Sequence, residues 1–237
     1  TATRILMMLS EIKLGDIVVT VTLKKIKNIH LSVYPHGEVK VSAPLHMNQE
    51  TVRAFLISKL SWIKQKKMKF QHQPREIPRD CITRESHYVW GTRYLLNVVE
   101  KNAPPQIVLT HSEMILHIRP ATALETRQAI IDEWYRAELK NKIPALIEKW
   151  ERITGVKVQK FFVQKMKTRW GSCNYTAKNV RFNSELAKKP IECLEYVVLH
   201  ELVHLLEPSH NARFHSLMTQ FMPNWALIKA ELNRLPI

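Results

Sequence analysis

The chain has 237 residues, of which 45% are hydrophobic and 24% are charged. This composition is typical of a folded globular protein with one large domain or two small ones, and it excludes disordered and fibrous classes. Lysine and arginine number 36 against 21 acidic residues, and the net charge of +15 favours anionic partners such as nucleic acid or nucleotides.

The cysteines indicate the compartment. Cys81, Cys173 and Cys193 are widely spaced and form no Cys-x-x-Cys pair, so they do not suggest a disulfide framework. A reducing compartment suits such a chain. The apolar run at residues 5–9 is too short for a signal-peptide core or a membrane span. We therefore expect a cytoplasmic protein without a membrane anchor.

The first third of the chain is predicted to form strands and then one helix. Residues 17–21 are all β-branched, and residues 31–34 lead through a Pro-His-Gly-Glu turn into a strand at 39–41. Asn48 is predicted to cap a helix that runs to about Phe70, because apolar residues recur along one face.

A connector at 73–78 then separates this region from further short segments. Four strands are predicted around 88–90, 94–99, 107–110 and 114–118. We find no internal repeat. The segment 1–120 is therefore predicted to be a β-rich N-terminal domain.

The chain changes character after residue 120. Thr122 and Glu125 form a capping-box pair that is predicted to open a long helix. Pro144 is expected to kink or split this helix, and Gly155 is expected to end it. Strands at 156–163 and 180–182, around the loop 169–173, predict a small antiparallel sheet. The fold class is therefore α+β, with a helical C-terminal domain over 121–237.

The most informative pattern is His200-Glu201-Leu202-Val203-His204. On a helix predicted over about 191–206, the two histidines lie one turn apart on one face and can reach one metal ion. Glu201 flanks that face, close enough to contact water at the metal. A third protein ligand would leave a fourth position open, as in catalytic zinc sites. The pattern predicts one zinc ion per chain.

The third ligand has two candidates. His210 follows the helix by a few residues, and Glu207 lies three residues after His204. We favour His210, because a third neutral imidazole suits zinc. In this hypothesis the ion activates a water molecule, and Glu201 acts as general base towards a peptide bond. Met218 and Met222, at helical spacing, are expected to pack in the core.

Two further motifs carry a resemblance. Lys167-Thr168-Arg169-Trp170-Gly171-Ser172-Cys173 and Asn179-Val180-Arg181-Phe182-Asn183 precede the histidine motif, and Pro208-Ser209-His210 and Phe214 follow it. With these residues the chain resembles the YgjP-like metallopeptidases, which are zincin-type enzymes related to the SprT and WLM groups. The resemblance implies that His200, His204 and His210 bind zinc and that Glu201 is the catalytic acid and base. The family often has Trp where this chain has His215. We expect His215 to be a surface residue, with a contact that supports the site or touches substrate as the alternative.

Substrate contacts are less constrained by the sequence. We expect Arg169 and Asn183 to contact a polypeptide substrate. Residues 180–183 could pair with an extended peptide if they form an exposed sheet edge. Residues 157–189 contain nine basic residues and one acid, Glu185. This basic rim leaves two alternatives open: a hydrolase of nucleotide phosphoanhydride or phosphoester bonds, and a nucleic-acid-associated protease or binding module.

Overall fold

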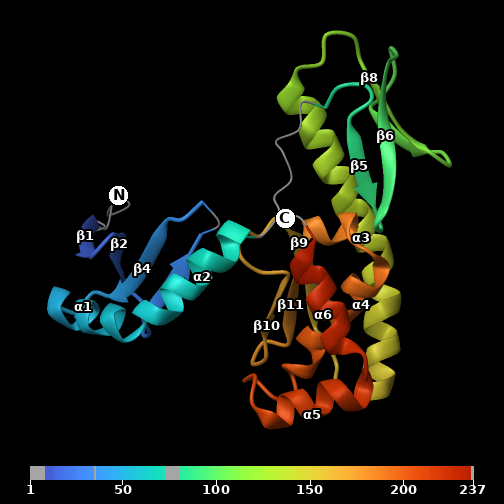
Figure 1. Cartoon of the computed structure of the whole chain (residues 1–237). Coiled ribbons are helices and arrows are strands. Elements are labelled where there is room, and N and C mark those ends of the chain that lie inside the picture. The colour runs from blue at the N-terminus through green and yellow to red at the C-terminus, as the bar shows by residue number, and fades with distance from the viewer. Residues whose placement is uncertain (1–8, 35, 73–80, 236–237) are drawn as a thin grey trace, which may run out of the picture. The chain divides into compact units, whose positions relative to one another are not determined.

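The computed structural model describes residues 9–34, 36–72 and 81–235 (Figure 1). Contacts divide the chain into two compact units, residues 1–73 and 74–237. Each unit has its own hydrophobic core. Helices and small mixed sheets alternate along the chain, which confirms the predicted α+β class. The predicted connector at 73–78 lies outside the described residues.

The first unit is a four-stranded sheet with two helices. Its strands are β1 (Leu9–Leu14), β2 (Ile17–Lys24), β3 (His30–Val33) and β4 (Val39–Pro44). The order is β1-β2-β4-β3, with β2 and β4 parallel and the outer pairs antiparallel. The predicted hairpin of β3 and β4 is confirmed. Alternate strand residues are buried, and Val52, Leu56 and Ile63 of the helices enter the same core.

The single helix predicted after Asn48 is in fact two helices, α1 (Gln49–Ser58) and α2 (Leu60–His72). Asn48 caps α1 as predicted, since its side chain accepts a hydrogen bond from Thr51 N–H at 2.8 Å. The break has a local cause. The Ser58 hydroxyl donates to the Phe55 carbonyl at 2.7 Å, so this side chain competes for a helical acceptor just before Lys59, which leaves helical geometry.

The second unit opens with a sheet of the same topology. Its strands are β5 (Ser86–Val89), β6 (Thr92–Glu100), β7 (Gln106–Leu109) and β8 (Glu113–Ile118). The order β5-β6-β8-β7 and the pairing directions repeat those of β1 to β4, and each set is followed by a helix. Gly15 and Gly91 occupy equivalent first turns with positive φ. The two sheets therefore repeat one topology, although the sequence itself shows no internal repeat.

The long helix α3 (Leu124–Thr154) runs along the second unit and contributes buried residues to its core over most of its length (Figure 1). It is not capped by Thr122, whose hydroxyl instead donates to the Arg119 carbonyl. Pro144 does not split it, because the buried stripe of Leu139, Ile143 and Ile147 continues across the proline and holds both halves against one core. The helix ends at Gly155 in the left-handed conformation, as predicted.

A second small sheet and the remaining helices follow α3. The strands β9 (Lys160–Gln164), β10 (Gly171–Asn174) and β11 (Asn179–Asn183) lie in the order β10-β11-β9. The two predicted strands, β9 and β11, pair in parallel, so the expectation of a purely antiparallel sheet is wrong. The antiparallel partner of β11 is β10, in the segment predicted to be a loop. The 3-10 helix η1 (Ser184–Lys188) leads into α4 (Ile191–Val203), α5 (Ala212–Phe221) and α6 (Trp225–Arg234).

Strand β11 is central in this sheet, so residues 180–183 are not an exposed edge, contrary to the expectation for peptide pairing. The free edge next to α4 belongs to β10. Met218 and Met222 lie in the core, as predicted. Across the described ranges, every helix is too short or too polar to cross a bilayer.

Candidate active site

The histidine motif lies at the end of a deeply buried helix. Helix α4 begins after Pro190, whose extended backbone precedes the first turn, and most of its residues are buried. It ends at Val203, and His204 forms the C-cap. His200 and His204 lie one turn apart, with ring centroids separated by 4.9 Å. The buried face of α4 therefore fixes both imidazoles at one edge of the core.

A short turn brings His210 to the same point. Glu207 forms this turn, because its carboxylate accepts hydrogen bonds from Ser209 N–H at 3.3 Å and from Ser209 Oγ at 3.0 Å. The Nε2 atoms of His210 and His200 then lie 3.0 Å apart. One ligand-capable nitrogen from each of the three histidines falls within 4.8 Å of the others. The structure thus brings together the predicted triad, with His210 rather than Glu207 as its third member.

The three imidazoles are held in their neutral form. Burial, reinforced by the charges of its histidine neighbours, lowers the pKa of His200 to about 3. Burial also lowers the pKa of His204 and of His210. His204 Nδ1–H donates to the Glu207 carbonyl at 3.2 Å, which leaves its Nε2 lone pair available. Three neutral imidazoles converging on one point fit a divalent transition metal such as zinc.

Phe214 packs beneath the triad. Its side chain is 1% exposed, and its ring centroid lies 5.0, 4.8 and 4.7 Å from those of His200, His204 and His210. Helix α5 presents this ring because Asn211 caps the helix by accepting from Phe214 N–H at 3.0 Å. An apolar floor of this kind limits the rotation of all three imidazoles.

Glu201 is the acidic group of the site. It is 4% exposed, and its Oε2 atom has no hydrogen-bond partner within the described residues. Burial raises the pKa of the carboxyl to about 8, although the charge of Arg169 opposes this rise. A buried carboxyl without a partner is costly for stability, so its presence points to a functional role.

A close contact with β10 fixes the Glu201 carboxylate. A Cβ atom on Gly171 would lie 2.5 Å from Glu201 Oε1 and 2.8 Å from its Cγ. No side chain larger than hydrogen fits there unless Glu201 moves. Gly171 is therefore required by this close approach, and not by a positive φ.

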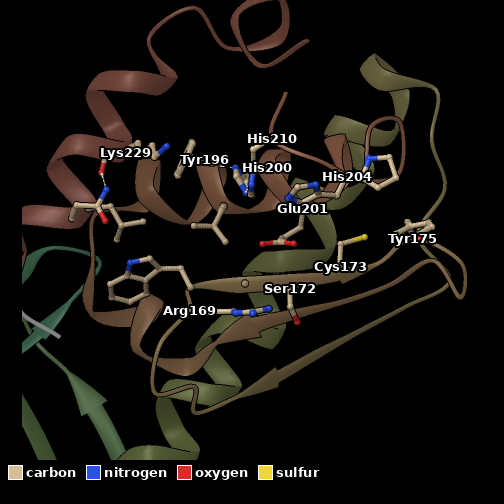
Figure 2. Close-up of a pocket in the computed structure, with 16 residues that line it drawn as sticks. Arg169, Ser172, Cys173, Tyr175, Tyr196, His200, Glu201, His204, His210 and Lys229 are labelled. Atoms are coloured by element: carbon tan, nitrogen blue, oxygen red, sulfur yellow. Dashed lines mark hydrogen bonds between the residues drawn. The ribbon is translucent and has the colours of Figure 1, made fainter. Parts of the chain in front are cut away.

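These groups open into one pocket of about 550 Å³ between α4, α6 and β10 (Figure 2). The triad and Glu201 lie along its centre. Figure 2 shows Lys229 and Tyr196 towards one end and Tyr175 towards the other. The Tyr196 hydroxyl lies 3.5 Å from His200 Nδ1, and Cys173 lines the wall near Glu201. Burial, with a smaller contribution from Glu201, raises the pKa of the Cys173 thiol to about 12, so this cysteine is a poor nucleophile.

A sequence model of the family described as YgjP-like, metallopeptidase domain, matches residues 27–235. The chain belongs to the YgjP-like family. It is accordingly a metal-dependent peptidase with a catalytic metal and polypeptide substrates. No curated protein sequence matches it closely enough to count as a relative.

Two solved structures show a weaker likeness to this YgjP-like chain. One is the metallopeptidase zymogen abylysin of Pyrococcus abyssi, with 17% identity, a TM-score of 0.36, and coverage of 40% of this chain and 99% of that one. The other is the metallopeptidase zymogen jannalysin of Methanocaldococcus jannaschii, with 19% identity, a TM-score of 0.34, and coverage of 38% and 93%.

The two predicted substrate contacts of the YgjP-like chain have different positions. Arg169 is exposed and lines the pocket near Glu201. Asn183 is 2% exposed, and its amide nitrogen donates to the carbonyls of Met166 and Arg169 at 2.8 Å. Its amide oxygen accepts from Met166 N–H at 3.2 Å. Asn183 thus braces the loop that precedes β10, and the structure places it away from the pocket lining.

Sequence reasoning on this YgjP-like chain missed Tyr196 and Lys229 as pocket residues. Tyr196 lies one turn before His200 on α4, so the helical spacing that revealed His204 could also have revealed it. Lys229 is on α6, more than 20 positions beyond the motif in the printed sequence. Only the packing of α6 against α4 brings it to the pocket, and no local pattern signals that contact.

Proposed function

We propose that this protein is a zinc-dependent peptidase of the His-Glu-x-x-His type. In this proposal His200, His204 and His210 hold one zinc ion, and Glu201 is the general base. The observation that carries it is the convergence of three neutral imidazoles beside a buried carboxyl, all opening into one pocket. The donor set matches that of catalytic zinc sites, in which three protein ligands leave one position open.

The residues of the pocket have different roles in peptide hydrolysis. When bound, the zinc ion supplies Lewis-acid chemistry that acidifies water and polarises a peptide carbonyl. Glu201 takes a proton from the attacking water and returns it to the leaving amine, and its Oε2 atom, which has no partner in the described part of the chain, is available for both steps. Gly171 leaves space for the Glu201 carboxylate, because any side chain at position 171 would displace it.

The free edge of β10 suits an extended substrate. Gly171, Ser172 and Cys173 of this edge strand line the pocket, whereas β11 is already paired on both sides. An extended peptide could add to the β10 edge through main-chain hydrogen bonds, which confer little sequence preference by themselves. The scissile bond would then pass across Glu201.

Replacement of Glu201 tests the mechanism directly. Glu201→Gln keeps the size of the side chain and removes its ability to accept a proton. We expect kcat for peptide hydrolysis to fall roughly 10²- to 10⁴-fold while the zinc content of the purified protein stays at one per chain. Nucleoside triphosphates assayed beside the peptides serve as a control for phosphoanhydride hydrolysis. Undiminished peptide hydrolysis by this variant would disprove the proposed mechanism.

Metal analysis tests the ligand set. We expect His210→Ala to lower zinc affinity by at least about tenfold, because one of three ligands is lost. Glu207→Gln is the matched control, since its carboxylate contacts Ser209 in the turn. Zinc content is measured after dialysis against a chelator of known affinity. If the Glu207 variant loses zinc and the His210 variant retains it, the ligand assignment is wrong.

A further inference from the structure

Two cations line the pocket, Lys229 and Arg169, and the proposed mechanism uses neither. Lys229 lies on α6 and is exposed, and no ion pair with a carboxylate is formed by it within the described residues. Lys229 lines the same pocket as the triad, and Figure 2 shows it at the end of the pocket where Tyr196 lies. Arg169, the other cation of the pocket, acts instead on Glu201.

A stack of rings holds Lys229 in place. Its Nζ atom lies 5.3 Å from the centroid of the Trp225 ring. Trp225 is fixed in turn, because its Nε1–H donates to Thr219 Oγ1 at 3.0 Å and its ring stacks on His215 at 5.5 Å with an interplanar angle of 13°. This cation–π contact favours the lysine conformation in which the ammonium group lies over Trp225.

The same stack continues to the triad. The His215 ring contacts Phe214 edge-on at 5.7 Å, and Phe214 contacts all three imidazoles. His215 Nδ1 is buried without a hydrogen-bond partner within the described residues, so ring packing positions this side chain. Continuous ring contacts therefore connect Trp225, on which Lys229 lies, to the three histidines.

We propose that Lys229 binds a carboxylate of the substrate near the scissile bond and that Trp225 and His215 position it for this role. The inference rests on the proposed peptidase function. Among the described residues that line the pocket, Glu201 is the only acidic one, so a substrate carboxylate at the Lys229 end meets a cation that has no carboxylate partner in the described part of the chain. Lys229 is thus a specificity-determining residue, and Trp225 and His215 are positioning residues.

A carboxylate can come from an acidic side chain or from the C-terminus of a peptide. Three pools of acetylated decapeptides separate these sources. Two amidated pools carry either Glu or Gln at one central position and mixed residues elsewhere, and a third neutral pool ends in a free carboxylate. The zinc-loaded full chain is assayed with each pool at low concentration, where the cleavage rate follows kcat/KM. We expect at least one carboxylate pool to be cleaved about tenfold faster than the neutral amidated pool, mainly through KM.

Variants of the stack decide whether Lys229 causes this preference. We expect Lys229→Gln to remove the tenfold ratio and Lys229→Glu to invert it in favour of a pool with Lys at the same position. Trp225→Leu should reduce the ratio, and Trp225→Phe should restore it, because a ring again underlies Lys229. Lys142→Gln, on the exposed face of α3, is the control that keeps the wild-type ratio.

Binding gives a readout that does not depend on hydrolysis. The zinc-loaded Glu201→Gln protein and its double variant with Lys229→Gln are titrated with each pool by calorimetry. Tighter binding of a carboxylate pool that disappears in the double variant supports the inference even if no peptide is hydrolysed, an outcome that would disprove only the proposed function. Equal binding of all pools to Glu201→Gln, or no binding of any, would overturn the inference.

Discussion

At the residue scale, the groups of the site are positioned by contacts between segments that lie apart in the chain, such as the contact of Gly171 in β10 with Glu201 in α4. Spacing alone placed His200 and His204 on one helical face, because helical periodicity is a local property. It could not establish that Glu207 would be engaged in a turn by Ser209, nor that Asn183 would be buried as a brace. Both facts depend on how segments pack, and a sequence pattern carries no information about burial of a polar side chain.

Gly171 gives the sharpest prediction at this scale. Any Cβ at this position would collide with the Glu201 carboxylate, so Gly171→Ala must displace the general base. We expect kcat to fall at least roughly tenfold, since small displacements of catalytic groups are costly. The melting temperature and the zinc content should stay close to those of wild type, because the backbone φ needs no change. Steady-state kinetics with metal analysis measures this, and a normal kcat would show that Glu201 can relocate without loss.

At the element scale, the ends of helices decided which expectations succeeded. The cap at Asn48 and the end at Gly155 follow from local chemistry and were predictable. The split between α1 and α2 and the uninterrupted α3 were not. The Ser58 hydroxyl bonds to the Phe55 carbonyl next to the break between α1 and α2, whereas buried residues on both sides of Pro144 keep α3 continuous. A proline within a helix costs about 3 kcal/mol, which the burial of a few aliphatic side chains can offset.

The end of α3 supports a pH-dependent prediction. The Glu151 carboxylate accepts hydrogen bonds from Val158 N–H and from Lys157 Nζ, each at 2.7 Å, and so secures the segment that leads into β9. Burial acts to raise the pKa of Glu151, but these two hydrogen bonds outweigh it, and the pKa lies below its ordinary value of 4.5. The folded state therefore gains stability from the ionised carboxylate above pH 4.5, and it loses this gain as the pH falls through the lowered pKa.

We expect Glu151→Gln to lower the free energy of unfolding by about 1–2 kcal/mol at pH 7. The difference from wild type should shrink as the pH falls below 4.5, because protonation then removes the same interaction from the wild-type protein. Urea unfolding at a series of pH values measures both quantities. Glu148→Gln, on the exposed part of the same helix, is the control. A difference that stays constant at acidic pH would assign the effect to packing rather than to charge.

At the scale of the whole molecule, the core of the active site extends far back along the chain. Buried residues from Cys81 onward belong to the same cluster as α4, and they include Met114, Leu116 and Ile118 of β8. The turn between β5 and β6 reaches the start of the motif helix, because Trp90 N–H donates to the Ala187 carbonyl at 2.8 Å. A Cβ on Gly91 would lie 3.0 Å from Pro190 Cγ. Residues before 120 therefore support the position of α4.

The domain boundary predicted at residue 120 and the contact division at residue 73 lead to different fragments. A fragment of residues 74–237 retains the whole core cluster that contains the site, so we expect it to unfold cooperatively and to bind one zinc ion.

A fragment of residues 121–237 lacks β5 to β8 and exposes the side chains of α3 that belong to the same core cluster, such as Ile131 and Tyr135. Each fully buried aliphatic or aromatic side chain that becomes exposed costs roughly 1.5–3 kcal/mol, and several such losses exceed the stability of a typical domain. We therefore expect this shorter fragment to lack a cooperative thermal transition and to bind zinc weakly, as measured by calorimetry and metal analysis. A cooperative transition with one bound zinc in residues 121–237 would instead establish the boundary at 120, because it would show that α3 and the triad fold without the preceding sheet.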